Sequence, residues 1–216
     1  MKTVITLSNK KSKIPEDFQH DDNRYPESLV TYFLKKYTKK GDKVIDIFAG
    51  LGTTMIVAEK LGRIPFGIEV DKKRCEFVRT KIKNKNNLIC GSCLSINKYQ
   101  FPMLDFAITS PPYNRIDEEN YLSGKRGYAG FLQDLNRVYQ QLKPLMRHKA
   151  HIILEVANLK GKEITPLAWD VAREISKVFH FEGEIVINWS TRGTNKGKGN
   201  YGYGYDHSYA LVFQNR

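Results

Sequence analysis

The chain has 216 residues, of which 41% are hydrophobic, and it carries a formal net charge of +12. This composition excludes a disordered chain and favours one globular domain over residues 1–216. No stretch approaches 18 consecutive apolar residues and the N-terminus lacks the apolar block of a signal peptide, so we expect a soluble, cytoplasmic protein with no membrane partner. The positive charge favours a polyanionic partner, usually nucleic acid, and nothing in the sequence indicates the oligomeric state.

Helical and strand patterns alternate along the chain. Apolar residues at helical spacing predict helices over 26–40, 53–62, 128–143 and 166–179, and a further helix that opens with Asp71 as its cap. Short apolar runs predict strands over 43–48, 65–69, 87–90, 104–109, 151–156, 184–189 and 208–213. This alternation predicts an α/β fold with a doubly wound, mostly parallel, seven-stranded sheet whose last strand is antiparallel.

A glycine turn follows the first of these strands. It reads Ala49-Gly50-Leu51-Gly52-Thr53-Thr54 and leads into a helix. The glycines allow the backbone to approach a ligand closely, and the N–H groups that open the helix can hold a carboxylate. Glu69 ends the next strand, at the spacing where a carboxylate meets ribose hydroxyls in nucleotide sites. A tight turn without a ligand is the alternative.

A second loop, Ser110-Pro111-Pro112-Tyr113, follows the strand over 104–109. Two adjacent prolines fix the φ angles of two successive residues and remove two N–H donors, so the directions of the backbone carbonyls are restricted. Tyr113 adds a flat face on which an extruded base can stack. The alternative is a tight turn with a half-buried tyrosine. Both loops follow the carboxyl ends of strands, so we expect them to open side by side at one edge of the sheet.

Three segments carry a resemblance to a known family. Asp46 through Thr54 (DIFAGLGTT), Gly67-Ile68-Glu69 and Thr109 through Asn114 (TSPPYN) resemble motifs I, II and IV of the S-adenosylmethionine-dependent amino-methyltransferases that modify cytosine N4 or adenine N6 in DNA. Residues 23–27, 187–189 and 207–213 resemble further segments of that family. The resemblance implies a Rossmann-like class I methyltransferase fold, S-adenosylmethionine as cofactor with S-adenosylhomocysteine as product, and a nucleic-acid partner.

The resemblance also implies roles for individual residues. The cofactor-binding set is Pro26, Asp46, Phe48, Ala49, Gly50, Gly52, Thr53, Thr54, Glu69 and Ser92. Within it, Thr53 or Thr54 lies near the methionine carboxylate and Glu69 lies on the ribose. The family usually has Gly-Asp where this chain has Gly91-Ser92, which leaves the adenine contact unassigned. The catalytic set is Ser110, Pro111, Pro112 and Tyr113, and the substrate-binding set is Asn114, Arg115, Trp189, Arg192, Lys196, Lys198 and Tyr203.

The expected reaction is direct methyl transfer. Hydrogen bonds from the amino protons to the Ser110 hydroxyl and the Pro111 carbonyl would return electron density to the amine nitrogen. The target base must be flipped out or already unpaired. Within the family that the chain resembles, serine at the first motif position is more typical of cytosine N4 enzymes, so the resemblance implies cytosine N4 in DNA. The alternatives are adenine N6 in DNA, cytosine in structured RNA such as ribosomal RNA, a protein glutamine amide, and a non-catalytic nucleic-acid-binding subunit.

No separate target-recognition domain is expected. The loops over 114–127 and 191–206 are the candidates for substrate contact. The second combines basic residues with interleaved tyrosines, and the basic residues of the first have plain loop charges as the alternative. A solvated, glycine-rich hairpin is the alternative for the second loop. Cys90 and Cys93 have C-x-x-C spacing, but no second pair of ligands lies nearby in the sequence, so no metal site is expected.

Overall fold

The structure is a computed structural model, and it describes residues 2–112, 126–160, 163–190 and 205–216. Its strands are β1 (Val4–Leu7), β2 (Lys43–Asp46), β3 (Ile64–Glu69), β4 (Leu88–Cys90), β5 (Leu104–Thr109), β6 (Met146–Val156), β7 (Leu159–Lys160), β8 (Ile164–Thr165), β9 (His180–Trp189) and β10 (His207–Gln214). Its α-helices are α1 (Glu27–Tyr37), α2 (Thr53–Lys60), α3 (Lys72–Arg79), α4 (Gly127–Leu142) and α5 (Leu167–Ser176). Short 3-10 helices are η1 (Glu16–Asp21), η2 (Lys85–Asn87), η3 (Cys93–Lys98) and η6 (Lys143–Leu145).

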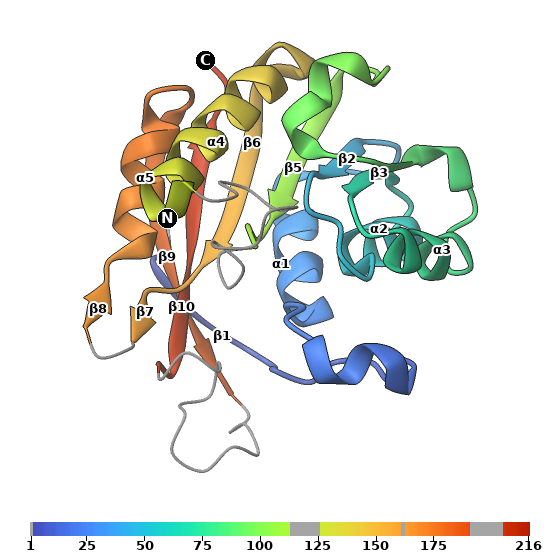
Figure 1. The fold of residues 1–216 in the computed structure, drawn as a ribbon, viewed down its shortest axis with the longest axis horizontal. Helices are drawn as coiled ribbons and strands as arrows, with labels where there is room; N and C mark the ends of the chain where they lie inside the picture. The colour runs from blue at the N-terminus through green and yellow to red at the C-terminus, as the bar shows by residue number, and fades with distance from the viewer. Residues whose placement is uncertain (1, 113–125, 161–162, 191–204) are drawn as a thin grey trace.

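In the described part of the chain, eight strands form one sheet in the order β1-β9-β10-β6-β5-β2-β3-β4 (Figure 1). β10 runs antiparallel to both of its neighbours, and every other pairing in this sheet is parallel. The predicted Rossmann-like class is therefore confirmed. The eighth strand, β1, was not predicted. It has four residues and pairs with the edge of β9, so it shows no periodicity of its own in the sequence.

Helices cover both faces of the sheet (Figure 1). α4 and α5 pack on one face, in a core that includes Ile45 of β2. α1 packs on the other face, in a core that includes Val44. Successive side chains of a strand point to opposite faces, and β2 therefore contributes to both cores. No helix among the described residues is long and apolar enough to cross a membrane.

Local hydrogen bonds explain where two helices begin or end. The Asp71 carboxylate accepts a bond of 3.0 Å from Arg74 N, so the predicted cap of α3 is confirmed. α1 was expected to continue to residue 40 but ends at Tyr37. The Thr38 hydroxyl donates to Leu34 O at 2.6 Å, and the Arg63 guanidinium also donates to this carbonyl. These donors satisfy a carbonyl in the last turn and end the helix before Gly41.

Candidate active site

Asp46, at the end of β2, is the centre of a buried hydrogen-bond network. Its carboxylate accepts bonds from Tyr25 Oη at 2.8 Å, from Thr109 Oγ1 at 2.6 Å and from Phe48 N at 3.1 Å. Only 2% of Asp46 is exposed. Burial raises the pKa of this carboxyl, and the hydrogen bonds oppose the increase. The network joins the segment before α1, the glycine turn and the end of β5.

The glycine turn has the backbone that only glycine adopts without strain. Gly50 has φ +53° and Gly52 has φ +78°. A Cβ at Gly52 would lie 2.8 and 2.9 Å from the two γ-carbons of Val78 in α3. Gly52 N donates to Ala49 O at 2.8 Å, and α2 begins at the next residue. The turn is thus held tightly between β2 and α3, with its N–H groups at the carboxyl edge of the sheet.

Glu69, at the end of β3, contacts the same turn. Its side chain accepts a bond of 2.7 Å from Gly50 N and one of 2.9 Å from Asp71 N. Burial raises the pKa of this carboxyl above its usual value, and the two backbone hydrogen bonds oppose the increase. A carboxylate has about four lone-pair sites, so acceptor capacity remains for a ligand hydroxyl.

Ser110, Pro111 and Pro112 lie next to this turn. β5 pairs with β2 in parallel, with Ile45 opposite Ala107, and Ser110 directly follows the bond from Thr109 to Asp46. Pro111 is buried, whereas Ser110 is partly exposed. The structure therefore brings the glycine turn and the described residues of the second loop, 110–112, to the same edge of the sheet (Figure 1). Tyr113, Asn114, Arg115, Arg192, Lys196, Lys198 and Tyr203 lie outside the described residues.

Three other predicted site residues have defined positions. Ser92 follows β4, whose last residue pairs with Glu69, so Ser92 lies at the same edge. Its hydroxyl accepts a bond from Leu94 N. Pro26 is buried and opens α1. Trp189 lies in the hydrophobic core with 1% of its surface exposed, and its indole donates to Ser208. The prediction that Trp189 contacts substrate is corrected here, because a core indole cannot reach a ligand in this structure.

Sequence reasoning missed Tyr25 and Thr109, which hold the Asp46 network together. Tyr25 Oη also forms a hydrogen bond with Thr54, whose side chain is fully buried. Burial and the Asp46 carboxylate raise the pKa of Tyr25 well above its usual value, so its hydroxyl stays a donor. The family-like segment 23–27 was the only signal for Tyr25, and it assigned no role to the side chain.

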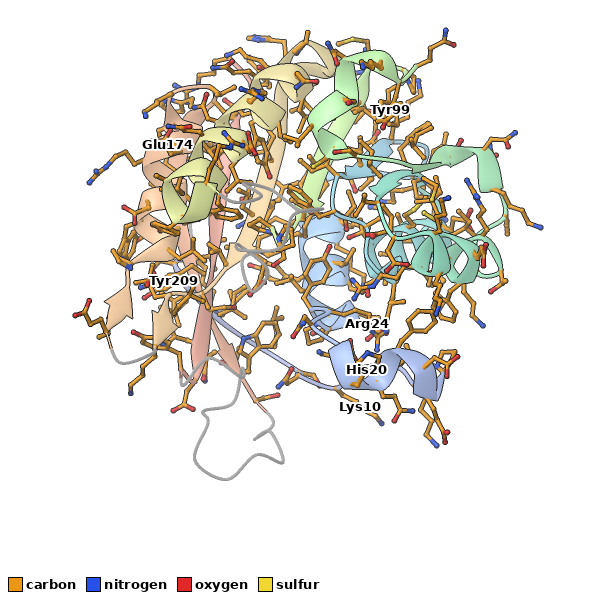
Figure 2. All side chains as sticks on the ribbon, in the orientation of Figure 1. Lys10, His20, Arg24, Tyr99, Glu174 and Tyr209 are labelled. Carbon is orange, nitrogen blue, oxygen red and sulfur yellow. The ribbon has the colours of Figure 1, made fainter. Side chains whose placement is uncertain are left out.

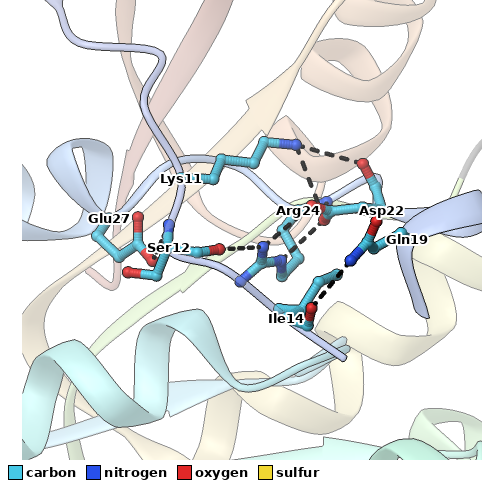
Figure 3. A network of polar contacts seen from close by, with 7 residues as sticks. All are labelled: Lys11, Ser12, Ile14, Gln19, Asp22, Arg24 and Glu27. Carbon is cyan, nitrogen blue, oxygen red and sulfur yellow. Dashed lines mark hydrogen bonds and ion pairs between the residues drawn. The ribbon is translucent and has the colours of Figure 1, made fainter. Parts of the chain in front are cut away.

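The segment before α1 is fixed by its own polar contacts (Figure 3). Arg24 donates to both oxygens of Asp22, at 2.8 and 3.0 Å, and to Ser12 O at 3.0 Å. Lys11 Nζ lies 3.3 Å from Asp22 O. The Ser12 amide donates to Glu27 in α1. These contacts tie the segment to the start of α1, next to Tyr25, whose hydroxyl contacts Asp46 and Thr54.

A cavity of about 160 Å³ lies between this segment and α2. It is lined by Ser12, Lys13, Ile14, Arg24, Glu27, Leu51, Thr53, Ile56, Lys60, Phe77 and Lys81. Four of these side chains are basic and one is acidic, so the cavity suits an anionic group. Thr53 Oγ1 is buried and has no hydrogen-bond partner among the described residues. A buried hydroxyl without a partner costs free energy, and a ligand carboxylate would satisfy it. The residues present therefore fit the methionine end of S-adenosylmethionine.

The sheet has the Rossmann-like fold of S-adenosylmethionine-dependent methyltransferases. Residues 3–80 match the family model described as DNA methylase, of the N6/N4 type. The resemblance to the amino-methyltransferases is thereby confirmed for this part of the chain, and S-adenosylmethionine is the cofactor that these comparisons support. The match includes the glycine turn and Glu69 but ends before Ser110, so it does not include the second loop.

Two curated relatives are similar to a short stretch of the chain. The type II methyltransferase M2.DpnII of Streptococcus pneumoniae is 38% identical over 61 residues, which is 28% of this chain and 23% of that protein. The ribosomal protein L11 methyltransferase of Thermotoga neapolitana is 39% identical over 59 residues, which is 27% of this chain and 22% of that protein. The aligned region thus spans less than a quarter of the length of either relative.

Solved structures resemble nearly the whole chain in fold. TrmN from Thermus thermophilus has a TM-score of 0.64 at 15% identity, over 92% of this chain and 51% of that one. A SAM-dependent methyltransferase from Methanosarcina mazei has a TM-score of 0.59 at 12% identity, over 84% of this chain and 96% of that one. At such identities the likeness concerns the fold alone.

Proposed function

We propose that this protein transfers a methyl group from S-adenosylmethionine to the exocyclic amino nitrogen of a nucleobase, with N4 of cytosine in DNA as the first candidate. The observation that carries the proposal is the bond of 2.6 Å between Thr109 and Asp46, which holds Ser110 and Pro111 beside the glycine turn. Methyl donor and acceptor would then meet at one edge of the sheet, as in-line transfer requires.

The residues of the second loop have a defined task in this reaction. When bound, S-adenosylmethionine supplies an electrophilic methyl group. The amino group of a base is a poor nucleophile because its lone pair is delocalised into the ring. The Ser110 hydroxyl and the Pro111 carbonyl accept hydrogen bonds from the two amino protons and favour a tetrahedral nitrogen with a localised lone pair. Tyr113 stacks on the flipped base, and the proton released by the reaction leaves to water.

The residues around the glycine turn hold the cofactor. Thr53 and the basic cavity beside α2 bind the methionine carboxylate, and Gly50 and Gly52 let the backbone approach the ligand. Glu69 binds the ribose with the acceptor capacity that its two backbone bonds leave free. Asp46 positions the turn through its three hydrogen bonds. Pro26, Phe48, Ala49, Thr54 and Ser92 complete the set around the cofactor.

DNA is favoured as substrate by the matched DNA methylase family and by the relative M2.DpnII. The net charge of +12 suits any nucleic acid, so cytosine in structured RNA and adenine N6 in DNA are the alternatives. We propose residues 1–216 as a single catalytic domain in which the loops over 114–127 and 191–206 contact the substrate. Arg126 of the first loop forms an ion pair with the buried carboxylate of Asp134, so it also anchors the start of α4.

A protein substrate is the second candidate function, since one of the relatives is named as a ribosomal protein L11 methyltransferase. That likeness is confined to 59 residues. A protein amide, such as that of glutamine, would present an amine of similar geometry to Ser110 and Pro111. The charge of the chain does not favour this substrate, and a protein arm in the experiment below tests it.

The experiment incubates the protein and methyl-labelled S-adenosylmethionine with unmethylated DNA, total RNA or ribosomal proteins. Digestion to nucleosides or peptides and mass spectrometry then identify the methylated atom. We expect N4-methyl-2′-deoxycytidine in the DNA arm, loss of the product with the double variant Ser110→Ala and Tyr113→Ala, and unchanged activity with Ser176→Ala at the exposed end of α5. Product in the RNA or protein arm alone would overturn the DNA assignment. A folded protein that neither binds the cofactor nor methylates any arm would overturn the proposal.

A further inference from the structure

A row of aromatic side chains lies outside the two loops. The rings of Trp169 and Tyr209 have centroids 5.2 Å apart, those of Tyr209 and His207 5.2 Å, and those of His207 and Tyr205 5.5 Å. The ammonium of Lys160 lies 5.9 Å from the centroid of the Tyr205 ring. We call these five residues the aromatic row. It combines residues of α5, of β10 and of the loop before it, and of β7.

The aromatic row lies at the same edge of the sheet as the candidate active site. β10 is antiparallel, so its first residues lie beside the carboxyl ends of its neighbours, and Tyr209 is opposite Val156 at the end of β6. β6 in turn pairs with β5, the strand that leads to Ser110. Two strand spacings, or about 10 Å, therefore separate the row from the second loop. Figure 2 shows Tyr209 beside α5, on the side where β7 and β8 lie.

Trp169 is the most exposed of the rings in the aromatic row, although tryptophan is highly buried on average in proteins. Trp169 is 44% exposed, whereas Trp189, which lies in the core, is 1% exposed. Tyr205, His207 and Tyr209 are partly exposed. His207 Nε2 and Tyr209 Oη form a hydrogen bond of 3.0 Å, which fixes the two rings relative to each other. The row thus combines partly exposed aromatic rings that contact one another with a cation at one end.

We propose that the aromatic row binds the unpaired bases that flank the target nucleotide in a single-stranded segment of nucleic acid. This inference rests on the proposed function and specifies its substrate. Every base has a π-face, so stacking on tyrosine, histidine and tryptophan holds a strand without reading its sequence. Bases inside a duplex stack on each other and cannot stack on the row. Lys160 is placed to pair with a backbone phosphate.

Tryptophan fluorescence tests this proposal directly, because the chain has two tryptophans and only Trp169 is exposed. The probe is a single-stranded oligothymidylate, which lacks the exocyclic amine that the proposed reaction needs. Quenching of Trp169 by this probe therefore reports on binding at the row without the amine contacts of Ser110 and Pro111. We expect quenching with the single strand and none with the same sequence in a duplex. Trp169→Phe should lose the quenching but keep the affinity measured by fluorescence anisotropy of a labelled strand.

Alanine substitutions measure the contribution of the row. Trp169→Ala and Tyr209→Ala should each weaken binding of the single strand roughly 5- to 100-fold, the range given by loss of one stacked base. Met103→Ala is the matched control, because Met103 is also 44% exposed but precedes β5 at the opposite edge of the sheet. It should leave the affinity unchanged. Cofactor affinity of each variant, measured by calorimetry, verifies that the fold is intact.

Three results would overturn the proposal. One is equal affinity of Trp169→Ala, Tyr209→Ala and the unchanged protein for the single strand. Another is equal quenching by the duplex. The third is equal quenching by polyglutamate, which would show a response to negative charge alone. Each of these can occur while the unchanged protein still methylates nucleic acid, so failure of this inference is distinguishable from failure of the proposed function.

Discussion

The Thr109 hydroxyl donates a hydrogen bond of 2.6 Å to Asp46 Oδ1, and both side chains are buried. Thr109 ends the strand that leads to Ser110, and Asp46 ends the strand that leads to the glycine turn. One bond therefore fixes the distance between the two loops of the candidate site. Because in-line methyl transfer depends on the separation of donor and acceptor, this bond has consequences for both stability and rate.

Thr109→Val tests the contribution of this hydrogen bond to stability and to the rate of methyl transfer. Valine has the same shape as threonine but leaves an Asp46 oxygen without one donor, which costs about 1–3 kcal/mol of unfolding free energy. We expect kcat for methyl transfer to fall while the Kd for S-adenosylmethionine changes little. Urea unfolding measures the stability, kinetics measures kcat, and calorimetry measures the Kd. Thr109→Ser keeps the hydroxyl and should restore most of kcat. Equal kcat in the valine and serine variants would contradict this role.

Tyr25→Phe should destabilise the fold and weaken cofactor binding. The hydroxyl of Tyr25 bridges Asp46 and Thr54, and its removal leaves two buried polar groups without this partner. The expected loss is about 1–3 kcal/mol of unfolding free energy. Tyr139→Phe is the matched control. Its hydroxyl is also buried but has no hydrogen-bond partner among the described residues, so removal should be neutral or slightly stabilising. Similar losses in both variants would show that the bridge contributes nothing specific.

Gly52→Ala should be more damaging than Gly41→Ala. Both glycines have positive φ, at +78° and +85°, so alanine meets the same backbone strain at each. At Gly52 the added Cβ also lies 2.8 Å from a γ-carbon of Val78, whereas at Gly41 nothing lies within 4 Å. Overpacking of this kind costs about 1–3 kcal/mol beyond the strain. Thermal unfolding measures the difference, and Val78→Ala in the Gly52→Ala background should recover part of it.

The sequence predicted most of the fold because its signals are local. Strand-turn-helix patterns around Gly50 and Gly52 and the cap at Asp71 depend on residues within a few positions of each other. β1 was missed because four residues carry no distinguishable period, and its place depends on pairing with β9, far along the chain. α1 ends early where Thr38 and Arg63 both donate to Leu34 O, and Arg63 belongs to another part of the sequence.

The candidate site was predicted in its loops but not in the contacts that join them. The bonds of Tyr25 and Thr109 to Asp46 connect segments that are distant in the sequence, and a hydroxyl gives no periodic signal. Trp189 shows the reverse error. It was predicted to belong to the substrate-binding set, but its burial depends on the packing of β9 against α1 and β10, which the sequence alone does not display.

Glu69 should make stability depend on pH. Burial raises its folded-state pKa above the unfolded value near 4.5, so the folded protein holds the proton more tightly than the unfolded chain. Its contribution to stability is therefore fully present below pH 4.5 and is lost as the pH rises through the folded-state pKa. We expect the unfolding free energy of the unchanged protein, minus that of Glu69→Gln, to fall across this window. Urea unfolding from pH 4 to pH 7 measures it.

Asp22→Asn is the control for this pH series, because the pKa of Asp22 is shifted in the opposite direction. Burial raises it, but the hydrogen bonds from Arg24 and the charges of Lys11 and Arg24 outweigh burial and lower it below 3.8. The contribution of Asp22 is present above pH 3.8 and is lost only as the pH falls through the lowered value. The difference between the unchanged protein and Asp22→Asn should thus stay constant from pH 5 to pH 7. A fall of equal size in both series would show that the pH dependence does not come from Glu69.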